Sequence, residues 1–173
     1  MSTKILLTVA LVALLVPVAA LAETQPSPAA VANQACSTLK TQMGASFAAT
    51  YGTNANKSNA FGQCVARQAS VASANINNAL KSCKTAQASD PAAFNAKYGT
   101  NGKSGGAGAA NNALGKCVSA AVKQATSTET KSLVAAAKTC KTALNASKTD
   151  FAAKWGAKSN AFGKCVAATA KTK

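Results

Sequence analysis

A cysteine-bearing peptide that occurs three times constrains the fold of this chain more than any other feature. Its copies read SNAFGQCVA over residues 58–66, NNALGKCVS over 111–119 and SNAFGKCVA over 159–167. Each copy closes a longer unit that starts with another cysteine, has phenylalanine eleven residues later, and then has tyrosine or tryptophan followed by glycine. The aligned positions are Cys36, Phe47, Tyr51, Gly52 and Cys64; Cys83, Phe94, Tyr98, Gly99 and Cys117; and Cys140, Phe151, Trp155, Gly156 and Cys165. Such self-similarity predicts three similar structural units.

Capping residues divide the chain into four main helices. Ser27-Pro28 is a typical helix start and Gly44 a typical helix end, so a first helix is expected between them. A second helix is expected from Ser58 or Asn59 to about Ala88, a third from near Asn111 to Ala146, and a last one from Ser159 onward.

Short helical turns are expected between these helices. Asp90 and Asp150 stand where N-cap residues are wanted, and each is followed by one of the Phe-x-x-x-Tyr/Trp pairs. The third long helix has one weak point, because Thr126 with Glu129 three residues later resembles a capping box. The sequence therefore leaves open whether this helix continues through Thr126 or breaks there.

Helix geometry selects the pairing of the six cysteines. Cys64 and Cys83 on one helix would lie about 28 Å apart, which is too far for a disulfide. The same objection applies to Cys117 and Cys140 unless the third helix breaks and folds back. Within each unit, both cysteines lie about two turns from the corner and reach the same height in an antiparallel hairpin. The predicted disulfides are Cys36–Cys64, Cys83–Cys117 and Cys140–Cys165.

The supply of bulky apolar residues is small, which makes these disulfides important. Low bulky-apolar content with high net charge usually favours disorder, whereas alanine, abundant here, is the best helix former. A fold whose helices form readily but enclose only a small apolar core gains the most stability from covalent links. We therefore expect an all-α fold in which disulfide-linked antiparallel helical hairpins form an up-down bundle from three internal repeats.

The first residues predict export. A single lysine, an apolar run from Ile5 to Val16 and the small-residue end Ala20-Leu21-Ala22 together resemble a signal peptide. The expected organisation is a signal peptide over 1–22 and a single helical domain over 23–173, with repeats at about 28–72, 73–126 and 127–173. A retained anchor is the alternative. An even number of cysteines fits the oxidising compartment that an exported chain meets, either outside the cell or in the cell envelope or periplasm.

The composition argues against an enzyme. Histidine is absent, the cysteines are expected to be oxidised, and the only acids are Glu23, Asp90, Glu129 and Asp150, which do not pair along the sequence. No CxxC pair occurs, so neither a metal site nor a cofactor is expected. An enzyme with an unrecognised site stays an alternative, in which a lone acid such as Glu129 would do acid–base chemistry.

Lysine is the residue type that suggests a function. The net charge is +15, or one less without Lys4, and Arg67 is the sole arginine. Six lysines of the third helix region fall in one stripe about 100° wide at helical spacing. Leucine, valine and cysteine residues lie opposite them: Leu114, Val118, Leu133, Cys140 and Leu144. The stripe consists of Lys116, Lys123, Lys131, Lys138, Lys141 and Lys148. It is either an ordinary solvated face or a surface that attracts polyanions.

One string carries a resemblance to known sequences. YGTNANKSNAFGQCVA, with its relatives YGTNGKS…NNALGKCVS and WGAKSNAFGKCVA, resembles a motif of secreted bacterial proteins, notably from actinobacteria, that have no assigned activity. The resemblance covers the three corners, and the middle unit departs from it by Leu114 and a longer loop. It implies export from a bacterium and nothing about chemistry.

The expected function is therefore binding by charge. We expect a non-enzymatic cationic protein that associates weakly and in a salt-dependent manner with anionic polymers, such as teichoic acid, lipopolysaccharide or extracellular DNA, or with an anionic membrane surface. Specific reading of nucleic acid is not expected, because arginine is nearly absent and the aromatic residues belong to the corners. The alternatives are a membrane-active, toxin-like module and a purely structural secreted protein whose charge keeps it soluble.

Overall fold

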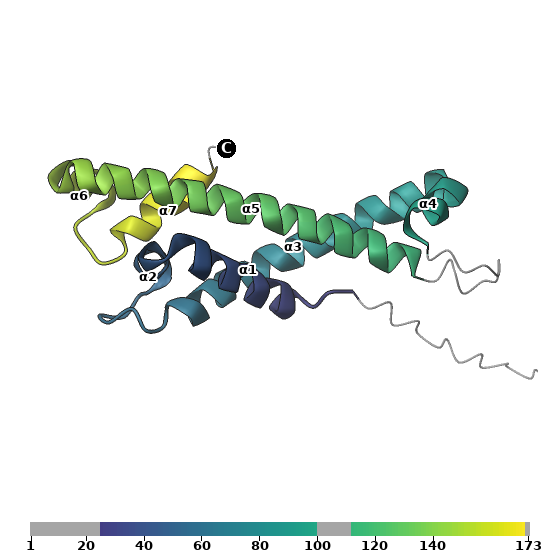
Figure 1. Cartoon of the computed structure of the whole chain (residues 1–173), viewed down its shortest axis with the longest axis horizontal. Helices are drawn as coiled ribbons and strands as arrows, with labels where there is room; N and C mark the ends of the chain where they lie inside the picture. Colours follow the sequence, from purple (N-terminus) through teal and green to yellow (C-terminus); the bar gives the residue numbers. More distant parts are fainter. Residues whose placement is uncertain (1–24, 100–111, 172–173) are drawn as a thin grey trace, which may run out of the picture.

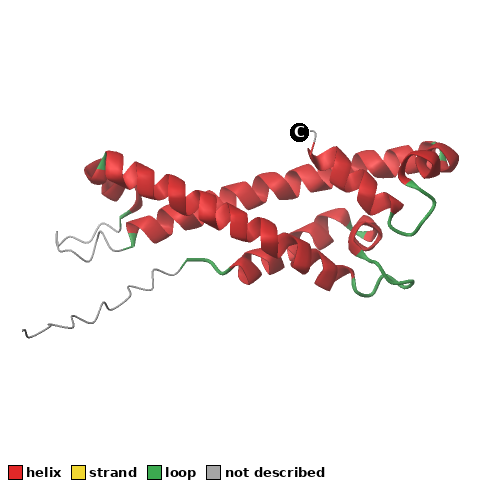
Figure 2. Ribbon diagram, turned by 180° about the vertical axis from the view of Figure 1, so that it is seen from behind, coloured by secondary structure: helices red, strands yellow, loops and turns green. Residues whose placement is uncertain are grey.

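The chain forms an elongated arrangement of seven helices in the part that the structure describes (Figure 1). This computed structural model describes residues 25–99 and 112–171, so the expected signal peptide lies outside the described residues. All regular structure within these stretches is helical, as Figure 2 shows, and the predicted all-α fold is confirmed. The helices are α1 (Pro28–Met43), α2 (Ala45–Tyr51), α3 (Ala60–Ser89), α4 (Pro91–Tyr98), α5 (Ala113–Ala146), α6 (Lys148–Trp155) and α7 (Ala161–Lys171).

Two long helices set the length of the molecule. With 30 and 34 residues, α3 and α5 extend about 45 and 51 Å and lie against each other. The remaining helices are placed unequally (Figures 1 and 2): α2, α6 and α7 lie at a wide end, α1 runs from that end to the middle, and α4 alone lies at a narrow end. At the wide end α1 packs against α3 and α5, whereas α7 packs against α5 and α2.

The apolar core is divided in the same way. The wide-end core includes Leu39, Phe47, Phe151, Phe162 and Val166, which come from four different helices. A second core at the narrow end contains Ile76 of α3, Phe94 of α4, and Val118 and Val122 of α5. Both cores are filled out by alanine and cystine, in keeping with the small supply of bulky apolar residues.

Three disulfides join α1 to α3, α3 to α5 and α5 to α7, each pair flanking one corner. The Cys36–Cys64, Cys83–Cys117 and Cys140–Cys165 pairs have Cα–Cα distances of 5.9, 6.0 and 6.0 Å. These are the pairs that equal distance from the corner predicts. All six cysteines are buried, so each cystine also contributes to a core.

Helix starts follow the expected capping residues at two places. The Ser27 hydroxyl accepts a hydrogen bond from the Ala30 backbone N–H at 3.2 Å, and Asp90 Oδ1 accepts one from Ala93 at 2.9 Å. Proline occupies the first turn of both α1 and α4, where its missing N–H leaves no hydrogen bond unmade.

Two details differ from the sequence-based expectation, and one question that the sequence left open is answered. Asp150 does not cap α6; the cap is Ser147, whose hydroxyl accepts from the Asp150 N–H at 3.1 Å, so that Asp150 lies in the first turn. The segment Ala45–Tyr51, for which no helix was predicted, forms α2. Finally, α5 continues without a break through Thr126 and Glu129, which are both half-buried and line the space between α1, α3 and α5.

Glycine of the recurring Asn-Ala-Phe-Gly peptide has different surroundings in its first and last copies. A Cβ atom added to Gly163 of α7 would lie 2.5 Å from the Thr50 carbonyl oxygen of α2. A Cβ atom added to Gly62 of α3 would have nothing within 4 Å. Close helix approach therefore requires glycine at position 163 and not at position 62.

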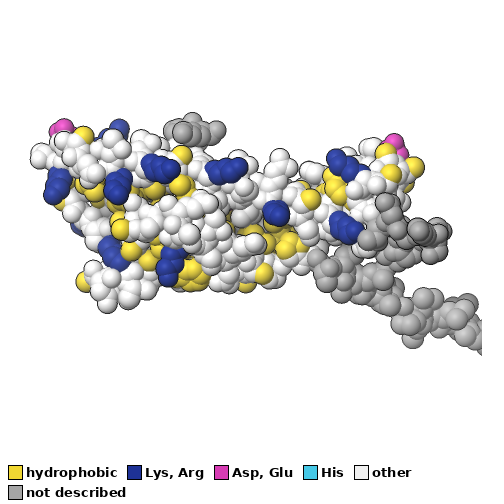
Figure 3. All heavy atoms as spheres, viewed as in Figure 1, with side chains coloured by type: hydrophobic (Ala, Val, Ile, Leu, Met, Phe, Trp, Pro, Cys, Tyr) yellow, Lys and Arg dark blue, Asp and Glu magenta, His cyan; other side chains and the backbone are white. Residues whose placement is uncertain are grey.

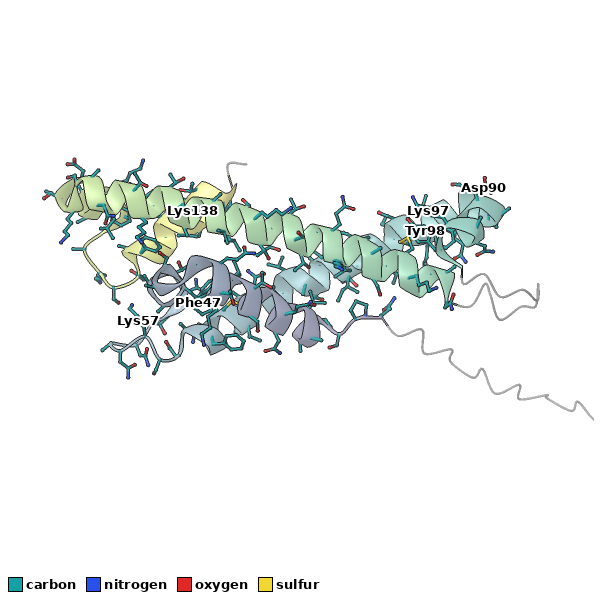
Figure 4. All side chains as sticks on the ribbon, in the orientation of Figure 1. Phe47, Lys57, Asp90, Lys97, Tyr98 and Lys138 are labelled. Atoms are coloured by element: carbon teal, nitrogen blue, oxygen red, sulfur yellow. A yellow bond between two sulfur atoms is a disulfide. The ribbon has the colours of Figure 1, made fainter. Side chains whose placement is uncertain are left out.

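One lysine ties two corners together. Lys57, in the loop between α2 and α3, has a φ of 60°, and its Nζ donates hydrogen bonds to the carbonyl oxygens of Gly52 at 2.9 Å and Ser159 at 3.0 Å. The first and third corners thus meet at the wide end, where Figure 4 labels Lys57 near Phe47.

Candidate functional site

The lysines of α5 form an exposed row along the molecule. Lys116, Lys123, Lys131, Lys138 and Lys141 all lie on α5 and are all exposed, and we call these five residues the lysine row. Figure 3 shows basic side chains following α5 across one face, with acidic side chains on that face only near the two ends of the molecule. The row is therefore a positively charged strip with little acidic charge close by.

Lys148 does not belong to this row. The sequence stripe included it, but α5 ends at Ala146, and Lys148 is the first residue of α6. The reason is the Ser147 cap, which interrupts the helix before Lys148 can continue the α5 spacing. Lys148 is exposed and adds positive charge near the wide end without extending the straight strip.

The spacing of the row decides what kind of anion it suits. Its members follow one another by seven, eight, seven and three residues, which corresponds to steps of about 10, 12, 10 and 5 Å along the helix. Most of these steps equal or exceed the Debye length of about 8–10 Å at physiological salt. The charges therefore act largely one by one, so that a long polyanion gains more from the row than a small ion does.

The acids are separated from the row. Asp90 and Asp150 are exposed and lie at opposite ends of the molecule. Asp90 is the N-cap of α4, and Asp150 lies in the first turn of α6. Glu129 is on α5 itself but is half-buried and lines the space between α1, α3 and α5. This arrangement leaves the charge of the row largely uncompensated on its own face.

A buried polar cluster joins three helices at the centre of the molecule. It consists of Tyr51 of α2, Gln68 of α3 and Glu129 of α5, and we call it the central polar cluster. Gln68 is 7% exposed and Tyr51 is 3% exposed, and the Gln68 side chain hydrogen-bonds to both Tyr51 and Glu129. The Arg67 guanidinium lies 5.9 Å from the Tyr51 ring centroid.

Burial changes the protonation of this cluster. Desolvation raises the pKa of Glu129 above its ordinary value, and the hydrogen bond from Gln68 partly opposes this rise. Desolvation is also the main reason that the pKa of Tyr51 is raised. The cluster ties α2, α3 and α5 together through the Gln68 side chain.

Sequence reasoning missed Tyr51 and Gln68 as partners of Glu129. One signal was available, because Gln68 lies four residues after Cys64 and four before Ala72 on the buried face of α3. A polar residue at a core position needs a hydrogen-bonding partner. The identity of that partner depends on how α2 and α5 meet α3, which the sequence of α3 does not specify.

Two grooves flank the centre of α5. The α1–α5 groove, of about 400 Å³, runs between those helices and includes Val31, Thr38, Val122 and Lys131 in its lining. A second groove of about 750 Å³ lies between α3, α5 and α7 and includes Glu129 and Leu133. Both are open to solvent, and Glu129 of the central polar cluster lines the second.

The aromatic residues of the corners are engaged within the fold. Phe47 and Tyr51 pack at 5.0 Å between ring centroids, as do Phe94 and Tyr98. The ammonium groups of Lys97 and Lys154 lie over the rings of Tyr98 and Trp155 at 5.2 and 5.4 Å. These rings are poorly placed for stacking on nucleobases, which such recognition uses.

Further possible sites were tested in the described residues. Over 25–99 and 112–171, no group of three or more His, Cys, Asp or Glu side chains is arranged to hold a metal ion. None of the helices in these two stretches combines the length and apolar character needed to cross a membrane. Three disulfides are typical of proteins in an oxidising, extracellular environment.

Comparison with protein-family models, with curated proteins and with solved structures found no match to this chain.

Proposed function

We propose that this protein is an exported, non-enzymatic cationic protein that associates with anionic polymers of the cell envelope or the surrounding medium through the lysine row. The observation that carries the proposal is the exposure of five lysines along one face of α5, with Asp90 and Asp150 at the far ends of the molecule. Candidate partners are teichoic acid, lipopolysaccharide, extracellular DNA and anionic membrane surfaces. Cleavage of a signal peptide after Ala22 and bacterial origin are part of the same proposal.

The expected interaction is electrostatic and sensitive to salt. Lysine is a point charge without the planar fork by which arginine recognises phosphate, so it favours diffuse attraction over selective binding. Each lysine that neutralises a phosphate makes the slope of log K against log salt steeper by about 0.7–0.9. Full engagement of five lysines would account for a slope of roughly −4.

The test distinguishes binding through the lysine row from binding through the net charge of the whole protein. Retention on heparin and teichoic-acid resins would be compared for the native protein and for a variant with Lys116, Lys123, Lys131, Lys138 and Lys141 changed to glutamine. The matched control changes five exposed lysines elsewhere to glutamine, namely Lys40, Lys81, Lys84, Lys158 and Lys164. Both variants lose the same charge, so the proposal expects a much larger loss of retention for the row variant.

Two outcomes would contradict this proposal. If the native protein bound neither resin at low salt, the proposal of polymer binding would be refuted. Equal losses for the two variants would show that net charge acts without any contribution from the row. Leakage of dye from anionic vesicles at low protein concentration would instead favour the membrane-active alternative.

A further inference from the structure

The lysine row is a straight line of charge because the helix beneath it is unbroken. This helix, α5, has 34 residues, and disulfides tie it to α3 at Cys117 and to α7 at Cys140. At about 3.6 residues per turn the five lysines fall within an arc of about 80°, and they extend about 37 Å from Lys116 to Lys141. Figure 1 shows α5 lying along the length of the molecule with little bend. The row therefore presents its charges along one line and on one face.

The row offers an anion little besides charge. Between Lys116 and Lys141, α5 contains no aromatic residue and no arginine, and its sole acid there is Glu129, which is half-buried. Stacking on a base needs an aromatic side chain, and selective recognition of phosphate uses the planar fork of arginine. A ligand of the row is therefore recognised by the number and the placement of its charges, and not by the groups that connect them.

A double helix of nucleic acid places few charges along such a line. Its strands wind around the axis once in about 34 Å, so each strand crosses a straight line on the duplex surface once per turn. A row of about 37 Å laid along the duplex therefore meets the phosphate backbone about two or three times. The other lysines of the row then face a groove rather than a phosphate.

A flexible single chain does not have this mismatch. Three bonds of an extended backbone advance about 3.5 Å, so a chain with six bonds between successive phosphorus atoms has a phosphodiester about every 7 Å. About six such units extend as far as the row does, and each lysine is then within about 4 Å, along the helix, of the nearest phosphate. The flexible four-carbon stem of lysine covers that offset. All five lysines thus engage one chain at the same time.

We infer that the preferred ligand of the lysine row is a single-chain polyphosphodiester of about six units or more, which lies extended along α5. The inference rests on the proposed function and narrows it, since it selects a flexible charged chain over duplex DNA and over small anions. It also sets a limit, because units beyond about the sixth find no further row lysine to bind.

The experiment measures how the salt dependence of binding changes with chain length. The probes are labelled propanediol phosphodiesters, which carry no base, with about two, six and twelve phosphates. Fluorescence anisotropy follows their binding between about 50 and 200 mM salt. Each engaged lysine makes the slope of log K against log salt steeper by about 0.7 for a single strand. The slope should therefore change from roughly −1.4 with two phosphates to roughly −3.5 with six, and stay there with twelve.

Two further ligands test the shape and the chemistry of the preferred chain. A duplex of about 20 base pairs should give a slope of only about −2 to −3, at about 0.9 for each backbone crossing. A thymidine chain with about six phosphates should bind within about threefold of the base-free chain, whereas stacking would tighten binding at least about fivefold per base.

Matched variants test whether the row is the site. The variant with the five row lysines changed to glutamine should lose the steepening of the slope with chain length. The control variant, with the same number of exposed lysines changed to glutamine at Lys40, Lys81, Lys84, Lys158 and Lys164, should keep it. Circular dichroism checks that both variants fold.

Several results would overturn the inference. A slope that keeps steepening from six to twelve phosphates would show binding by the charge of the whole surface. A duplex slope as steep as that of the six-phosphate chain, or equal slopes for the two variants, would also contradict it. Phosphatidylglycerol vesicles that displace the chain at a lower phosphate concentration than unlabelled chain does would assign the row to a membrane surface. Retention of the native protein on the resins tests polymer binding itself, so the two proposals can fail separately.

Discussion

The contact between α7 and the backbone of α2 predicts opposite effects for the same substitution at two related positions. Gly62 and Gly163 occupy the same place in the recurring peptide, and both lie in the first turn of a helix. Changing either glycine to alanine adds one methyl group. At Gly62 that methyl group has nothing within 4 Å, whereas at Gly163 it would lie 2.5 Å from the Thr50 carbonyl oxygen.

The magnitudes follow from two terms. Alanine is favoured over glycine in a helix by up to about 1 kcal/mol, and this gain is available at both positions. At position 163 the helices must also separate by about 0.5 Å or more to reach a tolerable contact, which disturbs the packing of Phe162 and Val166. Overpacking of this kind costs about 1–3 kcal/mol. Gly62→Ala should therefore stabilise the protein and Gly163→Ala should destabilise it, with a gap of about 2 kcal/mol.

The assay is urea and thermal unfolding followed by circular dichroism, with the disulfides intact. A gap of about 2 kcal/mol corresponds to melting temperatures that differ by about 4–8 °C in a domain of this size. The two variants have the same composition, so the comparison isolates the position of the added methyl group. Equal stabilisation by both substitutions would refute the reasoning, because it would mean that α7 does not rest directly on α2.

Three further predictions concern buried groups. Burial raises the pKa of Glu129, so the folded chain binds this proton more tightly than the unfolded chain does. Glu129 therefore favours folding below about pH 4.3, and this stabilisation is lost as the pH rises through the raised pKa. Glu129→Gln should therefore reduce the decline of the urea midpoint between about pH 4 and pH 8, and an unchanged decline would contradict the raised pKa. Replacing Cys83 and Cys117 by alanine should lower the free energy of unfolding by up to about 4 kcal/mol, given their separation of 34 residues, and hydrogen exchange should show protection lost first in α4 rather than at the wide end. Thr126 Oγ1 is buried without a hydrogen-bonding partner, so Thr126→Val should raise the free energy of unfolding by about 1 kcal/mol. The control is Thr139→Val, which should change it little, because Thr139 is exposed and its hydroxyl donates a hydrogen bond to the Ala135 carbonyl.

Local rules predicted those parts of the fold that depend on a few neighbouring residues. Ser27 and Asp90 cap their helices as the sequence indicates, because a cap needs only its own hydrogen bond within one turn. The disulfide partners were also predictable, since helical rise excludes a bond between Cys64 and Cys83 and favours equal heights across a corner.

Where two good local signals compete, the sequence alone does not choose between them. Ser147 and Asp150 are both favourable N-cap residues, and the structure uses the earlier one. That choice places Lys148 in the first turn of α6. The lysine stripe had continued the helical spacing to Lys148, past the predicted helix end at Ala146, where that spacing no longer applies.

Tertiary contacts account for the remaining differences. The capping-box pattern of Thr126 and Glu129 favours a helix start, but a start there would pull Glu129 away from Gln68 and expose the centre of the molecule. Gly62 and Gly163 lie in nearly identical local sequences, and a helix backbone lies close to Gly163 but not to Gly62. Neither outcome is encoded within the helix concerned, so no reading of that helix alone predicts it.

The disulfides and the lysine row are connected through α5. Lys116 precedes Cys117 and Lys141 follows Cys140, so the outermost members of the row adjoin the two points at which α5 is covalently tied to α3 and α7. A helix tied at both ends and packed along one side keeps its charges at fixed spacings, whereas a flexible lysine-rich peptide must order itself when it binds and loses conformational entropy in doing so. The proposed polymer association therefore requires only a thin core held by cystines, because the row needs a straight support and not a large apolar interior.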